Sequence, residues 1–576
     1  MILPRPRTFF ARCLNTIGVP SRVTFTLTRA FFSCHHMKRK RSVLEELRPV
    51  KISRCGMATV KITLTRQESQ LRNLLLDVAR YIDESKEIKE KIELRFAGGW
   101  VRDKLLGIPS NDIDTAINAM TGHAFSTKMR EYLTDKGNQR KHGFGAGGLG
   151  NLHKISANPE KSKHLETVTT KIYGFDVDFV NLRKETYLDD SRNPQMEFGT
   201  AEEDALRRDA TINALFYNLH TDLVEDFTSG LEDLTTRRIR TPLEPKTTFT
   251  DDPLRVLRLI RFSSRLDFTI DPASEAAMSD PAVMTALNSK ISRERVGAEL
   301  EKMLSKGRDP KGSLNLIDRL GLYSTIFSDP KTEGAFTPDT KDWHIAYEFL
   351  AELKSNEKLG VIYESLFPEN LDDVKYISWV LASLTPWSQS PLPQPPAGSF
   401  KVPLPLGTRV AREGLKLPSK ICDAITGAFR HREQITELKE AIVRKDDYTN
   451  DPAIVGMTIR RWNSQGGYWR LQALFAILVD ALNSDTGSFS AIVSDWAEFI
   501  THLNRMKIMD AASVKSIIDG KQLCKELGGI KPGVWMKPAL DVVMEWQLRN
   551  PGVEDYQEAI QGLKRRREEL QIPMPQ

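Results

Sequence analysis

Two aspartates separated by a single apolar residue are the first feature of this 576-residue chain that could do chemistry. Asp112 and Asp114 flank Ile113 in a segment, residues 112–117, whose pattern predicts a strand. Because side chains alternate between the two faces of a strand, both carboxylates point the same way and Ile113 points into the core. Two such carboxylates repel each other unless a divalent cation lies between them. Oxygen ligands suit a hard cation, so the pair predicts a site for a divalent cation.

Groups that bind phosphate come just before the acidic pair. Gly98 and Gly99 follow an apolar run at 94–97 that is expected to be a strand. They precede a helical pattern with Arg102 in its first turn. A bare backbone, a helix N-terminus and a guanidinium all suit an anion such as phosphate. Alone, the glycines could be an ordinary turn and the carboxylates two solvated strand residues. Together they indicate metal-assisted phosphoryl or nucleotidyl transfer.

Two further groups of charged residues follow in the sequence. The first puts two cations, an acid and an amide at the predicted start of a helix: Arg207, Arg208, Asp209 and Asn213. The second spaces an acid and two cations three residues apart along one predicted helical face: Asp252, Arg255 and Arg258. In isolation, either group could be a surface ion-pair patch, which contributes little to stability.

The composition is that of a globular protein, with 40% hydrophobic and 27% charged residues. Nine Lys and Arg and no acids lie in residues 1–44, so the net charge of +6 becomes −3 for the rest of the chain. If the protein binds a nucleic acid, it therefore does so through a local basic patch. The five cysteines show no Cys-x-x-Cys spacing, which argues against a zinc site and for a reducing compartment. No apolar run reaches the roughly eighteen residues that a membrane span needs.

The N-terminus has the composition of a targeting segment. Residues 1–36 are rich in Arg, Ser and Thr and contain no acid, as mitochondrial transit peptides do. A basic cluster of the nuclear-import kind follows at 38–41, and Met37 and Met57 offer later starts. We therefore expect a mitochondrial form, with nuclear or cytosolic forms from the downstream starts. The alternative is a disordered basic tail.

Hydrophobic periodicity divides the chain into an α/β part and a long helical part. The strand predicted at 171–180 alternates so that Asp176 and Asp178 share one face. Residues 137–150 are rich in glycine and are interpreted as a mobile loop. From Leu206 onward helical periodicity dominates to the end of the chain.

The order of these motifs resembles that of the class II tRNA nucleotidyltransferases, the CCA-adding enzymes of the polymerase-β nucleotidyltransferase superfamily. The resemblance covers the family's catalytic, sugar-discriminating, hinge-forming, base-reading and helix-stabilising motifs, which match 98–114, 207–215, 226–234, 251–258 and 291–300. One departure is Asp251, where the family often has Glu. The absence of a His-Asp phosphohydrolase signature, with the N-terminal segment, points to the eukaryotic type.

The resemblance implies template-independent addition of C-C-A to the 3′ end of tRNA from CTP and ATP, with release of pyrophosphate. Asp112 and Asp114 would be catalytic and would ligate Mg²⁺, with Asp178 as a candidate third carboxylate. Asp252 as acceptor and Arg255 as donor would read the pairing edge of cytosine and adenine. The residues implied to bind nucleotide are Gly98, Gly99, Arg102, Arg207, Arg208, Asp209, Asn213, Asp252, Arg255 and Arg258.

The implied fold is an α/β catalytic head with a mixed sheet of the polymerase-β type, followed by an all-α neck, body and tail. The expected boundaries are 1–57 for the targeting segment, 58–220 for the head, 221–310 for the neck, 311–440 for the body and 441–576 for a tRNA-binding tail. The partners would be the tRNA acceptor arm, CTP and ATP, and no membrane. Two alternatives stay open: a bacterial-type poly(A) polymerase, and a non-catalytic RNA-binding protein on the same scaffold.

Overall fold

The computed structural model of the protein describes residues 60–144, 168–188, 191–331, 336–368, 372–398, 400–484 and 489–575. The expected targeting segment and residues 145–150 of the glycine-rich stretch lie outside these ranges. Thr59–Gln576 forms one compact unit. Among the helices described, none combines the length and the apolar character needed to cross a lipid bilayer.

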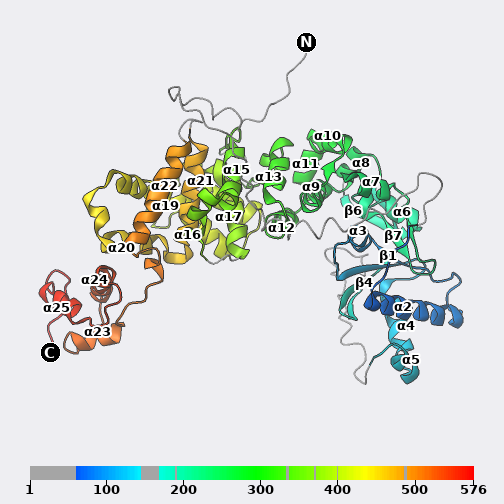
Figure 1. The fold of residues 1–576 in the computed structure, drawn as a ribbon, viewed down its shortest axis with the longest axis horizontal. Coiled ribbons are helices and arrows are strands. Elements are labelled where there is room, and N and C mark those ends of the chain that lie inside the picture. The colour runs from blue at the N-terminus through cyan, green and yellow to red at the C-terminus, as the bar shows by residue number, and fades with distance from the viewer. Residues whose placement is uncertain are drawn as a thin grey trace, which may run out of the picture. The chain divides into compact units, whose positions relative to one another are not determined.

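A mixed sheet carries the predicted catalytic residues (Figure 1). Its strands are β1 (Leu94–Ala97), β2 (Asp112–Ile117), β3 (Val168–Ile172), β4 (Phe175–Asn181), β7 (Phe216–Asn218) and β8 (Leu223–Glu225). They lie side by side in the order β3-β4-β2-β1-β7-β8. β2 and β4 run parallel, and the other neighbouring pairs are antiparallel. The predicted α/β head with a mixed sheet is thus confirmed.

Helices of 6 to 20 residues and a hairpin accompany this sheet. They are α2 (Arg66–Ser85), α3 (Gly99–Leu105), α4 (Gly122–Tyr132), α5 (Lys136–Lys141), β5 (Arg183–Leu188), β6 (Ser191–Phe198) and α6 (Ala201–Leu206). α2 begins at a capping box formed by Thr65 and Glu68. Its apolar stripe, which includes the fully buried Leu71 and Leu74, packs in the same core as Phe96 of β1. This burial fixes the strands that hold the site.

Two segments differ from the sequence-based expectation. Part of the glycine-rich stretch forms α5, because the Asp135 side chain accepts from the backbone N–H groups of Gly137 and Asn138 at 2.8 and 2.9 Å. Arg207, expected at the start of a helix, is instead the C-terminal cap of α6. Only a 3₁₀ turn, η2 (Thr211–Asn213), follows it. A helix C-terminus favours cations, which suits an arginine there.

The segment after the sheet is mostly helical, as predicted. It contains α7 (Gly230–Thr236), β9 (Arg238–Ile239), α8 (Pro245–Asp251), α9 (Leu254–Leu266), β10 (Thr269–Ile270), α10 (Pro272–Met278), α11 (Pro281–Lys290) and α12 (Arg293–Leu304). β9 and β10 pair in parallel as a separate two-stranded sheet. α9 follows α8 after a short break at Asp252 and Pro253, so Asp252 caps α8 and does not lie within α9.

Further helices continue the large core. They are α13 (Pro310–Arg319), α14 (Tyr323–Ile326), α15 (Trp343–Ser355), α16 (Glu357–Leu366), α17 (Asp372–Leu384), η3 (Thr385–Gln389), α18 (Leu406–Arg409), η4 (Val410–Gly414), α19 (Ser419–Arg444), η5 (Asp447–Asn450), α20 (Pro452–Trp462), η6 (Ser464–Gly466), α21 (Trp469–Leu482), α22 (Phe489–Arg505) and η7 (Ala511–Ser513). Fully buried Trp343, Trp462 and Trp496 are among the largest side chains of this core.

The last helices have an apolar core of their own. They are α23 (Gly520–Glu526), α24 (Met536–Arg549) and α25 (Gln557–Arg565). Leu523, Trp535 and Leu563 are buried in a cluster separate from the large core. This second core lies within the segment expected to be the tail.

Candidate active site

The two predicted catalytic carboxylates lie on one face of β2. Ile113 between them is fully buried, as the alternation of a strand requires. β4 runs alongside in parallel register, with Asp176 opposite Asp112 and Asp178 opposite Asp114. Four carboxylates therefore project from one face of two neighbouring strands. This side of the sheet carries a concentrated negative charge.

The crowding of these acids changes their protonation. Burial raises the pKa of Asp114 to about 6, and the charges of Asp112 and Asp178 add to this rise, against an opposing effect of Arg208. Burial and the charges of Asp178 and Asp176 also raise the pKa of Asp112. A divalent cation would relieve this repulsion, and carboxylate oxygens are the ligands that a hard cation prefers.

Asp178 is close to the pair but has a partner of its own. The Thr169 hydroxyl donates to its Oδ1 at 2.5 Å. Within the part of the chain that the structure describes, no three Asp, Glu, His or Cys side chains are arranged to surround one metal ion. The geometry is that of a two-carboxylate site, with Asp178 beside it.

The glycine turn between β1 and α3 lies next to Arg208. Gly98 has φ +68°, a left-handed conformation that favours glycine, and its N–H donates to Leu215 O at 3.0 Å. A Cβ atom at Gly98 would lie 2.7 Å from Arg208 Nη1. A Cβ atom at Gly99 would meet only Arg102 Nη2, at 3.6 Å. Gly98 is thus required by its own conformation and by the neighbouring guanidinium.

Arg102 points into the protein. Its side chain is 4% exposed, its Nε donates to Asp103 Oδ1 at 2.8 Å, and its Nη1 donates to Asn213 Oδ1. Asp103 also accepts from Arg265 of α9 at 3.1 Å. Arg102 therefore orders Asn213, and Asp103 connects α3 to α9.

Asp209 and Asn213 form a second paired network with Arg258 of α9. Asn213 Nδ2 donates to Asp209 Oδ1 at 3.0 Å, and Arg258 Nε donates to Asp209 Oδ2 at 2.6 Å. Burial alone would raise the pKa of Asp209, but the Arg258 guanidinium and the Asn213 amide outweigh it and lower the pKa to about 2. Asp209 is therefore ionised at neutral pH.

The two expected base-reading residues have different partners. Asp252 Oδ2 lies 3.8 Å from Arg295 Nη2 of α12. Arg255 is 9% exposed, and its Nη2 donates to the backbone oxygen of Arg207 at 2.7 Å. The contact of Arg255 joins α9 to the segment that carries Arg207 and Arg208, so the predicted base-reading and sugar-binding motifs adjoin.

Asp103, Asp204 and Arg265 contribute to the networks around the predicted site residues but were not singled out from the sequence. Asp204 could have been found, because it precedes Arg207 and Arg208 by three and four residues, the spacing at which helical side chains meet. Asp103 and Arg265 meet across 162 residues of sequence, and no local pattern marks such a contact. Arg295, the partner of Asp252, lies in the motif matched at 291–300.

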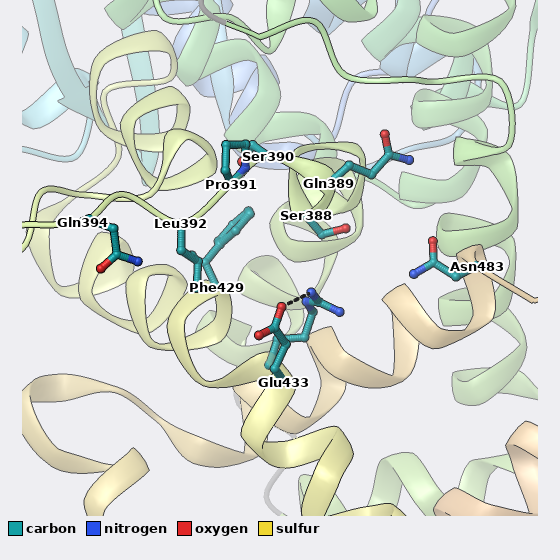
Figure 2. Close-up of a pocket in the computed structure, with 10 residues that line it drawn as sticks. Ser388, Gln389, Ser390, Pro391, Leu392, Gln394, Phe429, Glu433 and Asn483 are labelled. Carbon is teal, nitrogen blue, oxygen red and sulfur yellow. Dashed lines mark hydrogen bonds and ion pairs between the residues drawn. The ribbon is translucent and has the colours of Figure 1, made fainter.

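A separate cavity of about 500 Å³ lies in the helical part of the chain. Figure 2 shows its lining by Ser388, Gln389 and Ser390 at the end of η3, with Phe429 and Glu433 of α19 across from them. None of the predicted site residues lines it, so it is distinct from the candidate active site.

Comparisons with known proteins agree with this geometry. The family model described as the Poly A polymerase head domain matches residues 94–240. The model described as a probable RNA and SrmB-binding site of polymerase A matches residues 267–334. These two models cover the sheet, the segment with Arg207 to Asn213 and part of the helices that follow, and neither spans α9.

Whole-length relatives define the family. The chain is 40% identical over 528 residues to the CCA tRNA nucleotidyltransferase, mitochondrial, of Saccharomyces cerevisiae, covering 88% of this chain and 94% of the yeast protein. It is 47% identical over 562 residues to the nucleotidyltransferase lcsQ of Purpureocillium lilacinum, covering 89% and 93%. It is 35% identical to the tRNA nucleotidyltransferase cca2 of Schizosaccharomyces pombe, covering 88% and 99%.

The fold also occurs in solved structures. A CCA-adding enzyme in complex with ATP superimposes with a TM-score of 0.59 at 20% identity, covering 89% of this chain and 97% of that one. The fold and the site define a nucleotidyltransferase of the polymerase-β superfamily. The whole-length relatives narrow this further: the chain belongs to the tRNA nucleotidyltransferase family.

Proposed function

We propose that this protein adds C, C and A in turn to the 3′ end of tRNA, using CTP and ATP and releasing pyrophosphate. The observation that carries the proposal is the carboxylate pair of β2, which lies near Arg208 and the Gly98 turn. Nucleotidyl transfer needs this combination of acids for a cation and a guanidinium for phosphate. Yeast relatives that match 88% of the chain are named for the same activity.

Asp112 and Asp114 would hold a divalent metal ion, which we take to be Mg²⁺ because two carboxylates on one strand face supply hard oxygen ligands. When bound, such an ion lowers the pKa of the tRNA 3′-hydroxyl and offsets the charge that develops at the α-phosphate of CTP or ATP. Asp112 and Asp114 must both be ionised to act. Asp178, on the neighbouring strand, would add negative potential to the same face.

The triphosphate would be received by residues around the β1–α3 turn. Gly98 and Gly99 leave the backbone bare, and Arg208 and Arg207 supply positive charge beside it. Asp209, which is ionised, and Asn213, whose amide is already hydrogen-bonded, would hold the sugar. Arg102 and Arg258 hold these two side chains in place. Arg102 donates to the amide oxygen of Asn213, and Arg258 donates to the carboxylate of Asp209.

Asp252 and Arg255 would select the base. Cytosine and adenine each present an amino donor beside a ring-nitrogen acceptor, so an acceptor and a donor on the protein can pair with either. Uracil and guanine present the opposite order and would leave both protein groups unpaired, which is costly. A good bidentate contact discriminates by about 1–3 kcal/mol.

The helical part would support the tRNA. We keep the divisions at 58–220, 221–310, 311–440 and 441–576 as part of the proposal, with the last segment as the tRNA-binding tail. Candidate contacts in that tail are Lys521, Lys525, Lys531 and Lys537. We propose a mitochondrial location, as the names of the Saccharomyces cerevisiae and Candida glabrata relatives state for those proteins, with nuclear and cytosolic forms from downstream starts.

One assay tests this function against its rivals. Purified protein is given a tRNA that lacks its 3′ end, with labelled CTP and ATP separately and together, and product lengths are read at single-nucleotide resolution. CCA addition predicts two nucleotides with CTP alone and three with both. A bacterial-type poly(A) polymerase would ignore CTP and make long A runs; the chain is 28% identical over 250 residues to poly(A) polymerase I of Haemophilus influenzae. A non-catalytic RNA-binding protein would bind the tRNA and extend nothing.

A further inference from the structure

Asp204 is a buried carboxylate that contacts both arginines of the proposed triphosphate site. It lies in α6, and its side chain is 2% exposed. Its Oδ1 accepts from Arg207 Nε at 2.9 Å and from Arg207 Nη2 at 2.5 Å. Its Oδ2 accepts from Arg208 Nε at 3.0 Å and from Arg208 Nη2 at 2.8 Å. One carboxylate thus holds two guanidiniums, one on each oxygen.

The surroundings fix Asp204 in its turn. The backbone N–H of Arg183 donates to Asp204 Oδ1 at 3.3 Å, and α6 begins at a capping box formed by Thr200 and Glu203. Burial alone would raise the pKa of the Asp204 carboxyl, but Arg208 and Arg207 outweigh it and hold that pKa below its usual value. Both guanidiniums are therefore ordered by an ionised acid of the chain itself, before any ligand arrives.

This arrangement holds Arg208 near the catalytic strand. Arg208 Nη1 donates to the backbone oxygen of Asn213 at 3.0 Å, and the guanidinium lies 4.9 Å from the centre of the Phe216 ring. Its positive charge opposes the rise in the pKa of Asp114, so the two groups interact. Arg207 Nη1 also donates to Glu185 Oε1 at 3.1 Å. Asp204 is the one contact that these two arginines share among the hydrogen bonds described.

We infer that Asp204 is a positioning residue for nucleotidyl transfer, which holds Arg207 and Arg208 in the orientation that receives the triphosphate. Without this carboxylate, two adjacent like charges repel each other and their long side chains regain rotamer freedom. The inference rests on the proposed function, because it concerns how the same site handles CTP and ATP. If Asp204 only balanced charge, the opposite result would follow, because loss of an anion would tighten the binding of an anionic nucleotide.

The first test removes the negative charge of Asp204 and keeps the shape of its side chain. Asp204→Asn is compared with Glu202→Gln, which removes the same charge from an exposed position on the same helix. We expect Asp204→Asn to lower kcat/KM for CTP and ATP by about 10- to 100-fold, the range seen when the partner of a ligating side chain is removed. The KM for CTP should stay the same or rise, and Glu202→Gln should behave as wild type. A lower KM with kcat retained, or no change, overturns the inference.

The second test asks whether Asp204 acts through its arginines. Asp204→Asn is introduced again in a background that carries both Arg207→Ala and Arg208→Ala, and each variant is compared with its parent under single-turnover conditions. The loss should shrink below about threefold, because residues that act as a unit are not additive. An undiminished loss would show that Asp204 acts elsewhere and would overturn the inference. Thermal unfolding and tRNA binding of each variant separate misfolding from mispositioning.

A third variant covers the case in which Asp204→Asn does not fold. Asp204→Glu keeps the charge and moves it by one methylene, so it should bind tRNA normally and lose kcat. A wild-type kcat for this variant would overturn the inference. If the wild-type protein itself incorporates neither CMP nor AMP, the proposed function fails, and the role of Asp204 fails with it for that separate reason.

Discussion

Two charged clusters in the head handle their charge in opposite ways. On β2 and β4 the carboxylates face one another, and burial with mutual repulsion raises the pKa of Asp112 and Asp114. In the second cluster, Asp204 and Asp209 are also buried, but arginines outweigh the burial and lower the pKa of both. The second cluster is balanced by the chain itself. The first is where we propose that a cation from outside the chain binds.

The largest effect should follow from removing a ligand of that cation. Asp112→Asn should lower incorporation of both CTP and ATP roughly a thousandfold or more, because metal stabilisation of transition-state charge amounts to several kcal/mol. tRNA binding, measured by fluorescence anisotropy, should change little. Asp176→Asn, on the same face but 55% exposed, is the matched control and should keep most activity. Equal losses in the two variants would contradict the two-carboxylate site.

Nucleotide choice should depend on the cluster in which arginines offset the buried acids. Arg255→Ala should reduce the preference for CTP and ATP over UTP and GTP by about 1–3 kcal/mol, because a donor to the base edge is lost. Competition assays with all four nucleotides measure this preference. Arg261→Ala on the same helix, whose guanidinium pairs with Glu299 at 2.7 Å, should leave it unchanged. Full selectivity in Arg255→Ala would rule out base reading by this residue.

The repulsion between the carboxylates on β2 should also lower the stability of the metal-free protein. The pKa of Asp114 is raised from 3.8 to about 6, so its contribution is favourable below pH 3.8 and is lost as pH rises through about 6. Asp114→Asn should therefore stabilise the metal-free protein by about 1–3 kcal/mol at pH 7–8, and by less at pH 5. Thermal unfolding in a chelator measures this. A destabilised variant at pH 8 would mean that the carboxylate is not repelled.

The smallest expected effect is a difference in stability between substitutions at the two glycines of the turn. Gly98→Ala should lower the free energy of unfolding by about 1–2 kcal/mol, because its φ is positive and Arg208 must move. Gly99 begins a helix, and a Cβ atom there would make only an ordinary van der Waals contact with Arg102 Nη2 at 3.6 Å, so Gly99→Ala should change stability by less than about 0.5 kcal/mol. Denaturant unfolding curves of the two variants give the comparison. Equal losses would mean that Arg208 does not constrain the turn.

The acidic cluster on β2 was predictable from the sequence. Much of the cluster in which arginines offset Asp204 and Asp209 was not. Strand alternation alone places Asp112 and Asp114 on one face and buries Ile113 between them. Asp103 and Arg265 lie on different helices, so their pairing depends on tertiary packing. The short helix after Asp135 was mistaken for a loop because glycine content outweighed the capping signal. Arg207 was assigned to a helix start, although the fold places it at a helix end.

The double ion pair of Asp103 constrains how this architecture can be recombined. This side chain is shared by Arg102 beside the catalytic turn and Arg265 near the end of α9. A hybrid enzyme that took its sheet from one homologue and α9 from another would have to preserve both ends of the bridge. If only one end were kept, a buried acid would lose half of its counter-charge. Crossover points in such hybrids should therefore be chosen after α9, so that both contacts are inherited together.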